Sequence, residues 1–257
     1  MSDILVHAEA GVMTLTLNRL ERKNSITSAM YGMLADAIHA AQEDANVRVA
    51  VLQGHETVFS AGNDIGDFLN GPPSTQESPV FRFLRGIATF PKPIVAAVCG
   101  PAVGIGTTML FHCDLVYATP TASLRTPFLD LGLVPEAASS LTAVMRMGQA
   151  RAFELLCLGE PFNAERGRDA GIINAVVPAA ELEATAMKAA RRLAAKPRGA
   201  LLAARRLMRG DPSALSAQID AEAKVFGERM RSAEAQEAFA AFFEKRPPDF
   251  KKARAKG

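Results

Sequence analysis

Cysteine, net charge and long hydrophobic runs are all scarce in this sequence of 257 residues. Its three cysteines, Cys99, Cys113 and Cys157, are odd in number and form no Cys-x-x-Cys pair, which argues against a disulfide framework and for reduced buried thiols. A formal net charge of only +2 indicates no polyanionic partner for the whole chain. No apolar run approaches the ~20 residues that span a bilayer, and the first residues do not resemble a secretory signal. We therefore expect a soluble intracellular protein with no membrane partner.

Several cofactor and nucleophile motifs are missing as well. His112 and Cys113 are adjacent, but no second ligand pair stands at metal spacing, so we expect no metal site. Gly104 and Gly106 could begin a dinucleotide-binding fingerprint, but Met109 holds the place of its third glycine, and no Gly-Lys-Ser/Thr triplet occurs. Without a Gly-x-Ser-x-Gly motif, covalent catalysis is the weaker hypothesis.

Segments with strand and helix periodicity alternate along the chain. Alternation of this kind predicts an α/β core with mainly parallel pairing. A long helix is predicted over residues 25–44. The predicted strands are a pair around a turn at Gly11, two apolar strands at 47–54 and 93–100, and two short strands at 114–119 and 173–178.

The composition changes near Pro178, after which the residues up to Arg246 are almost all helix formers. We take residues 1–195 as the α/β core and residues 196–257 as a C-terminal helical region. Its large apolar residues either pack on the chain's own core or form a subunit interface; they are Val225, Phe226, Met230, Phe239, Phe242 and Phe243. The polar stretch from Asn70 to Pro79 is the clearest loop and is typical of a flap.

Two glycine-containing stretches could present free backbone N–H groups. In "VFSAGNDIGDF", residues 58–68, small side chains let a ligand approach the backbone closely, although the same residues also suit a plain turn. In "CGPAVGIGTTMLFHCD", residues 99–114, a strand runs through glycines into a helix predicted to start near Gly106. A helix N-terminus favours an anion or an oxyanion.

A third stretch carries a carboxylate. In "RTPFLDLGLVPEAASS", residues 125–140, Pro135 and Glu136 are predicted to start a helix, where proline and an acid are both favourable. Glu136 is therefore either an ordinary first-turn residue or an acid/base. Two amides aimed at one point and one nearby carboxylate would suit proton abstraction next to a thioester carbonyl.

These stretches, together with "LNRLERKNSIT" and "NAERGRDAGIINAVVP", resemble the crotonase (enoyl-CoA hydratase/isomerase) superfamily in order along nearly the whole chain. The resemblance implies a crotonase-like (ClpP/crotonase) α/β spiral of ββα units with a C-terminal helical trimerisation region. It also implies a bacterial cytoplasmic enzyme, a homotrimer or a hexamer built from two trimers, and an acyl-coenzyme A thioester substrate. Coenzyme A is then part of the substrate, and no separate cofactor is expected.

The resemblance assigns site residues by position. Glu136 would be the catalytic acid/base, and the amides of Ala61 and Ile105 would form the oxyanion hole. Coenzyme A would run past Arg22 and a loop made of Ser60, Ala61, Gly62, Asn63, Asp64 and Ile65. Phe242 and Lys245 would lie against coenzyme A, either of the same subunit or of a neighbour.

Two departures bear on the reaction. Hydratases of the family carry two glutamates, at positions held here by Thr108 and Phe128. Glu136 instead resembles the single catalytic glutamate of Δ3,Δ2-enoyl-CoA isomerases. The favoured reaction is therefore a double-bond shift, in which Glu136 removes a proton from C2 of a 3-enoyl-CoA and returns it at C4. The acyl chain length and the pathway, whether fatty acid β-oxidation or degradation of another acid, stay open.

Two alternatives remain. One is another crotonase-type reaction, such as hydration with relocated acids, acyl-CoA hydrolysis or a ring modification, with Asp64 and Asp130 as spare carboxylates. The other is a non-catalytic protein that binds coenzyme A or RNA. The basic stretch 189–210 could neutralise phosphates, but no aromatic residue interleaves there for base stacking, so nucleic acid is not expected.

Overall fold

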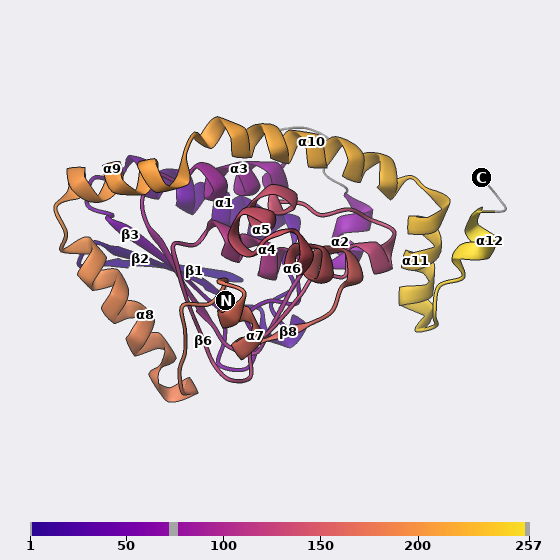
Figure 1. The fold of residues 1–257 in the computed structure, drawn as a ribbon, viewed down its shortest axis with the longest axis horizontal. Helices are drawn as coiled ribbons and strands as arrows, with labels where there is room; N and C mark the ends of the chain where they lie inside the picture. The colour runs from indigo at the N-terminus through magenta and orange to yellow at the C-terminus, as the bar shows by residue number, and fades with distance from the viewer. Residues whose placement is uncertain (1, 72–76, 255–257) are drawn as a thin grey trace.

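The structure, a computed structural model, describes residues 2–71 and 77–254, so part of the predicted loop from Asn70 to Pro79 lies outside it. Its main sheet has six strands in the order β1-β2-β3-β4-β6-β9 (Figure 1). β1 and β2 pair antiparallel, and every later neighbour pairs parallel, which confirms the predicted α/β core. The strands are β1 (Ile4–Glu9), β2 (Val12–Leu17), β3 (Val49–Gln53), β4 (Ile94–Val98), β6 (Leu115–Ala118) and β9 (Ala175–Val176).

A second, smaller sheet is built from β5 (Pro101–Val103), β7 (Ser123–Arg125) and β8 (Phe162–Asn163). β4 belongs to the main sheet and β5, which follows after a short turn, to the small one, as expected for a spiral of ββα units. A parallel bridge between Ser60 and Ala102 extends the small sheet by one more segment. This pairing places two loops side by side at the candidate active site described below.

Both faces of the main sheet are covered by helices. Val49 and Val51 of β3 pack toward α8 (Ala179–Ala194), whereas Ala50 and Leu52 belong to the core that contains α1 (Ser28–Glu43) and α3 (Pro79–Thr89). Successive strand residues point to opposite faces, so a strand buried on both faces is apolar throughout. This explains why β3 and β4 read as continuous hydrophobic runs.

The C-terminal region consists of helices, as predicted. Helix α10 crosses α3 and reaches α5, while α11 and α12 lie at the far end of the molecule (Figure 1). Within the described ranges, no helix has the length and hydropathy needed to cross a membrane. The helices are α9 (Arg198–Arg209), α10 (Pro212–Met230), α11 (Ala233–Glu244) and α12 (Phe250–Arg254).

Short helices connect the spiral turns and position the site. The α-helical ones are α2 (Ile65–Asn70), α4 (Ile105–Thr108), α5 (Ser139–Met147), α6 (Gln149–Phe153) and α7 (Ala164–Asp169). The remaining turns are the 3-10 segments η1 (Leu20–Arg22), η2 (Met109–His112) and η3 (Leu129–Leu131), and the π-helical segment η4 (Glu154–Leu158).

Candidate active site

Glu136 lies in a turn that precedes α5, and the prediction that Pro135 and Glu136 start this helix is wrong. The helix begins at Ser139 because Ala137 and Ala138 adopt left-handed backbone conformations, with φ of 60° and 54°. Left-handed residues other than glycine are uncommon and strained, and they cluster at functional sites. Glu136 is thus presented by a strained turn and not by a regular helix.

The carboxylate of Glu136 meets the glycine-rich stretch at Thr108. The Thr108 hydroxyl donates a hydrogen bond of 2.5 Å to Oε1 of Glu136. Burial raises the pKa of Glu136 to about 8, the Thr108 hydrogen bond lowers it, and the charge of Glu222 raises it further. A carboxylic acid with a pKa near neutrality, close to a helix that follows a glycine turn, is suited to proton transfer.

The predicted oxyanion donor Ala61 is not free to take that role. Its N–H donates to the carbonyl oxygen of Lys23 at 2.9 Å, because Lys23 turns the chain with a left-handed φ of 54°. Among the hydrogen bonds of the described residues, none uses the N–H of Asn63 or of Ile105. This loop therefore offers the N–H of Asn63, in place of that of Ala61, as a free amide.

The register of the small sheet brings the Asn63 and Ile105 amides to the same end. Ser60 pairs parallel with Ala102, and the Val103 N–H donates to the Ser60 carbonyl oxygen at 2.9 Å. Asn63 and Ile105 each follow this pair by the same number of residues. The approach is close, since a Cβ atom on Gly62 would lie 2.8 Å from the Val103 oxygen.

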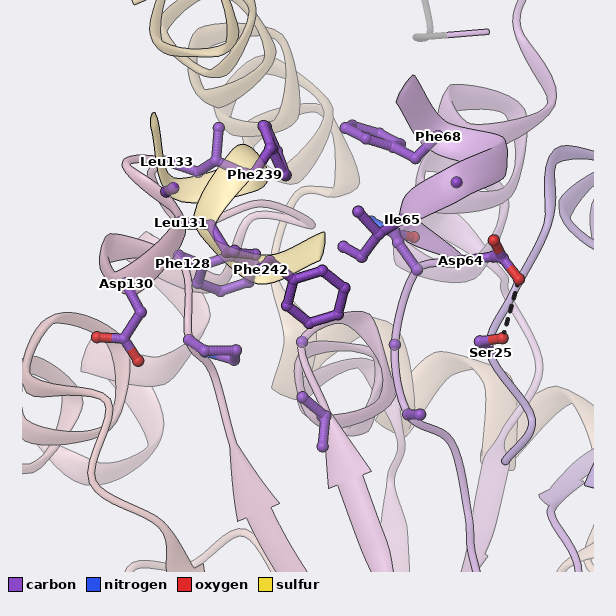
Figure 2. A pocket seen from close by; sticks show the side chains of 18 of the residues that line it. Ser25, Asp64, Ile65, Phe68, Phe128, Asp130, Leu131, Leu133, Phe239 and Phe242 are labelled. Atoms are coloured by element: carbon purple, nitrogen blue, oxygen red, sulfur yellow. Dashed lines mark hydrogen bonds between the residues drawn. The ribbon is translucent and has the colours of Figure 1, made fainter. Parts of the chain in front are cut away.

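A cavity of about 670 Å³ opens at this end of the sheet (Figure 2). Most of the predicted binding residues line it: Arg22, Ala61, Gly62, Asn63, Asp64, Ile65, Ile105 and Phe242. Glu136 is partly exposed but is not itself a lining residue. Thr108, which bonds Glu136, lies one helical turn after Ile105, which lines the cavity. Leu133, three residues before Glu136 in the sequence, lines the cavity as well. Glu136 therefore adjoins the inner end of the cavity.

Two predicted binding residues do not reach the cavity. Ser60 is fully buried, where its hydroxyl donates to the Asn24 carbonyl oxygen and accepts from the Gly62 N–H. Lys245 ends α11 in a left-handed conformation, exposed, and the next residue, Arg246, lines the cavity instead. Ser60 therefore shapes the loop from within, and Arg246 is a cavity residue that the sequence reasoning missed, whereas Arg22 was predicted.

The cavity wall is rich in aromatic residues, several of them from the C-terminal helices. Phe226 of α10 and Phe239 of α11 line it together with Phe128 and Leu133, and Phe68 of α2 meets Phe226 edge-to-face with ring centroids 6.1 Å apart. Of the large apolar residues noted in the sequence, these two pack inward, whereas Phe242 and Phe243 are more than half exposed at 54% and 57%. Composition alone did not separate the two groups.

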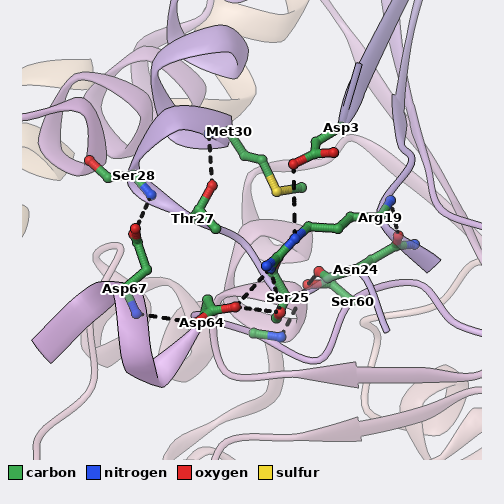
Figure 3. A network of polar contacts seen from close by, with 11 residues as sticks. Asp3, Arg19, Asn24, Ser25, Thr27, Ser28, Met30, Ser60, Asp64 and Asp67 are labelled. Atoms are coloured by element: carbon green, nitrogen blue, oxygen red, sulfur yellow. Dashed lines mark hydrogen bonds and ion pairs between the residues drawn. The ribbon is translucent and has the colours of Figure 1, made fainter. Parts of the chain in front are cut away.

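The loop that carries Asn63 is fixed by a polar network (Figure 3). Asp64 accepts from Arg19 at 2.8 Å and from Ser25 at 3.2 Å, and its other oxygen caps α2 at the Asp67 N–H. These bonds, with that from Arg19 the largest influence, lower the pKa of Asp64. The Tyr31 hydroxyl of α1 also donates to the Asn63 side-chain oxygen. The loop is thus held from both sides.

The other spare carboxylates are also engaged. Asp130 lies across the cavity from Asp64 (Figure 2), is exposed, and pairs with Arg125 at 3.1 Å. Asp114 pairs with Arg205 at 2.9 Å and accepts from the Ile94 N–H, as a structural acid would. Over the described residues, no group of three or more histidine, cysteine, aspartate or glutamate side chains could hold a metal ion.

Comparisons with known proteins agree with this geometry. A family model described as "Enoyl-CoA hydratase/isomerase" matches residues 7–253. The chain is 36% identical to "1,2-epoxyphenylacetyl-CoA isomerase" of Escherichia coli (strain K12), over 97% of this chain and 98% of that protein. It is 34% identical to "Enoyl-CoA delta isomerase 2" of Rattus norvegicus over 95% of this chain, and it spans only 64% of that longer protein.

Solved structures match over nearly the full length. An enoyl-CoA hydratase/isomerase from Pseudoalteromonas atlantica T6c superposes with a TM-score of 0.92 at 39% identity, covering 96% of this chain and 99% of that one. Pseudomonas aeruginosa OdaA superposes with a TM-score of 0.91 at 45% identity, covering 94% of this chain and 99% of that one.

Proposed function

The chain belongs to the enoyl-CoA hydratase/isomerase family, and on that premise we propose that it is a Δ3,Δ2-enoyl-CoA isomerase. The observation that carries the proposal is the contact of Glu136 with Thr108. Thr108 stands where the family's hydratases have a glutamate, so a single carboxylate with a raised pKa occupies this end of the site. A double-bond shift needs only one group to move one proton along one face of the acyl chain.

The site is poorly suited to adding water by the family's usual route. Both hydratase glutamates are replaced, by the buried hydroxyl of Thr108 and by the phenyl ring of Phe128 on the cavity wall. Asp64 has a lowered pKa and is bound to Arg19, which makes it a weak base. Asp130 is paired with Arg125 at the surface. A water molecule therefore lacks two opposed carboxylates to activate and deliver it.

The proposed reaction follows from the geometry. The thioester carbonyl oxygen of a 3-enoyl-CoA accepts hydrogen bonds from the N–H groups of Asn63 and Ile105, with Asn63 in place of the Ala61 predicted from sequence. The carboxylate of Glu136 removes a C2 proton, the dienolate charge rests on the carbonyl oxygen, and Glu136 returns the proton at C4. Removal of one oxyanion donor typically costs about 2.7–4 kcal/mol of barrier. A positioned acid/base contributes about 10²–10⁴-fold.

The remaining cavity residues fit an acyl-CoA. Arg22 places a cationic side chain at the cavity, where it can meet the phosphates of coenzyme A, whereas the Arg246 side chain, also at the cavity, is paired with Glu237 and Glu244. The aromatic wall offers the apolar surface that an acyl chain requires. Coenzyme A enters as part of the substrate, and each step above uses this chain's own groups.

A paired turnover assay tests the proposal. A 3-enoyl-CoA should gain ultraviolet absorbance as its double bond becomes conjugated with the thioester, and the matching 2-enoyl-CoA should lose none. Absorbance loss from the 2-enoyl-CoA would mean that the enzyme is a hydratase with carboxylates other than those the family uses. Absence of gain from a series of 3-enoyl-CoA chain lengths would reject the isomerase.

A second candidate reaction is the isomerisation of an epoxide-bearing arylacyl-CoA. Two observations favour it: the full-length similarity to the 1,2-epoxyphenylacetyl-CoA isomerase and the aromatic wall formed by Phe68, Phe128, Phe226 and Phe239. The same amides and Glu136 would serve this substrate. Turnover of 1,2-epoxyphenylacetyl-CoA, followed by chromatography in parallel with the paired assay, distinguishes the two reactions.

We also propose that the protein assembles as a homotrimer or a hexamer in the bacterial cytoplasm. Exposed apolar side chains on α9 and α11 support an interface, with Leu207 and Met208 exposed at 83% and 87% and Phe242 and Phe243 at more than half. Light scattering should give three or six times the mass of one chain. A monomeric mass would reject the assembly and with it the role of Lys245 toward a neighbouring coenzyme A.

A further inference from the structure

The turn that presents Glu136 is held by groups distant in sequence. Ala137 and Ala138 are consecutive left-handed residues, a conformation that non-glycine residues leave unless other contacts hold them. Helix α5 begins immediately after them, and its N-cap residue Ala138 offers no side chain to bond the free N–H groups. The sequence around the turn thus supplies neither the conformational preference nor the cap.

Glu222 of α10 supplies the cap. This side chain is 7% exposed, and its Oε2 accepts from the Ala138 N–H at 2.6 Å, although the residues are 84 positions apart. Its Oε1 accepts from the Ser140 N–H at 3.0 Å and from the Ser140 hydroxyl at 2.5 Å. Gln218, one turn earlier on α10, donates to the same hydroxyl oxygen, so the hydroxyl proton is directed to Glu222. Burial raises the pKa of Glu222, and the three donors that converge on its carboxylate lower it and so oppose that effect.

The opposite side of the turn is held by His112. Its Nε2 lies 2.7 Å from the Ala137 carbonyl oxygen, and because a carbonyl only accepts, the proton of the neutral ring is on Nε2. Burial lowers the pKa of His112 to about 3, so the ring is neutral. The Ala137 C=O and the Ala138 N–H are thus both bonded, which fixes the Ala137–Ala138 peptide.

We propose that Glu222 is a positioning residue for catalysis, which keeps the Ala137–Ala138 turn left-handed and thereby directs the Glu136 carboxylate. The inference rests on the proposed role of Glu136 as the base. It makes α10, which lies in the C-terminal helical region, a contributor to the active site and not only a cover for the core. An ordinary helix cap would stabilise the protein without any influence on the proton-transfer step.

Glu222 also acts on Glu136 through its charge, which provides a second readout. The titratable groups facing Glu136 are Glu222 from α10 and the buried Tyr31 from α1, with neutral His112 on η2 bonded to the adjacent residue. Tyr31 has its pKa raised well above its usual value by burial, so it is neutral as well. Glu222 is therefore the charged neighbour whose removal lowers the pKa of Glu136.

The test uses Glu222→Gln with a conformational rescue by Ala138→Gly. Glutamine keeps the shape of the side chain but cannot accept all three bonds, so kcat should fall by at least about tenfold with KM changed little, as for a group needed in the transition state. Glycine adopts positive φ without strain. The double variant Glu222→Gln/Ala138→Gly should therefore recover most of kcat. Asp211→Ala, which removes the side-chain cap of α10 itself, is the control and should leave kcat unchanged.

A second measurement, the titration of Glu136, does not depend on the substrate. It is followed by ¹³C nuclear magnetic resonance of labelled glutamate, and the Glu136 signal is assigned by its loss in Glu136→Gln. Its midpoint should move to lower pH in Glu222→Gln and stay low in the double variant, because glycine restores the turn but not the charge. An unchanged midpoint, or a loss of kcat that glycine fails to correct, would overturn the proposal. If the wild type turns over no 3-enoyl-CoA, the proposed function fails, and the midpoint still decides the role of Glu222.

Discussion

Thr108 and Glu136, 28 residues apart in the sequence, share a hydrogen bond of 2.5 Å in which the hydroxyl donates to the carboxylate. On the resemblance that underlies the proposed function, Thr108 takes the position of a hydratase glutamate, and the site would then have a neutral donor where a hydratase has a second acid. The bond stabilises the ionised form of Glu136 and orients it. It lowers a pKa that burial has raised, and so it keeps the base usable near neutral pH.

Replacing Thr108 by valine tests this relationship. Valine has nearly the same shape but donates no hydrogen bond, so the pKa of Glu136 should rise, and kcat/KM at pH 7 should fall by up to about tenfold for each unit of the rise. The midpoint of the pH profile should move to higher pH. Thr107→Val is the control, because the Thr107 hydroxyl bonds the Ala102 carbonyl oxygen and not Glu136. An equal midpoint in both variants would show that the hydroxyl has no influence on the base.

The pH profile of the wild type should report Glu136 directly. The base must be ionised to accept a proton, and its pKa is raised to about 8. We therefore expect kcat/KM to increase with pH, to reach half its maximum near pH 8, and to fall about tenfold for each unit below that. Initial rates measured between pH 5 and pH 10 in buffers of constant ionic strength give the profile. A half-maximum near the ordinary glutamate pKa would exclude Glu136 as the base.

The Ile105 amide can be removed without breaking the helix that carries it. Ile105 is the first residue of α4, and proline is tolerated at this position because its missing N–H has no partner within the helix. Ile105→Pro should lower kcat by about 10²–10³-fold if the amide binds the oxyanion. Ile105→Ala keeps the N–H but loses the same buried side chain, so it controls for packing. Similar kcat values in the two variants would reject the Ile105 amide as a donor.

The sequence predicted the parts of the fold that local pattern determines. The apolar runs that form β3 and β4 are buried on both faces. The helix that covers one face was predicted from the spacing of Met30, Met33, Leu34, Ala37 and Ile38, of which Met33 is exposed. The resemblance to a family brought Thr108 and Glu136 into one site, and the structure places them in contact. These features depend on short-range periodicity or on the order of motifs along the sequence, and both are visible in the sequence itself.

What the sequence could not predict depends on bonds between distant segments. Pro135 and Glu136 have the local preferences of a helix start, but His112 and Glu222 hold the following residues left-handed, and the helix begins later. In the same way, Ala61 lies in the expected loop, but the left-handed turn at Lys23 places a carbonyl oxygen at its N–H. The first error arises where tertiary hydrogen bonds override a local preference, and the second where a hydrogen bond occupies an amide that the resemblance had assigned by position; both lie at the candidate site.

The raised pKa of Glu136 also implies that the ionised base destabilises the fold, and Glu136→Gln tests this apart from activity. With a folded pKa of about 8 and an ordinary value of 4.5, the folded state retains a proton that the unfolded state has lost between these two pH values. Stability therefore falls as pH rises through this window. Glutamine does not titrate but still accepts from Thr108. The variant should therefore be close to the wild type near pH 5 and gain up to about 4 kcal/mol over it by pH 9, at about 1.4 kcal/mol for each of the roughly three pKa units crossed. Urea unfolding at several pH values measures the difference, and Glu183→Gln on the exposed face of α8 should stay within about 0.5 kcal/mol of the wild type throughout. If the difference in unfolding free energy does not grow with pH, the surroundings of Glu136 do not raise its pKa. Glu136 would then lack the near-neutral pKa that the proposed proton shuttle requires.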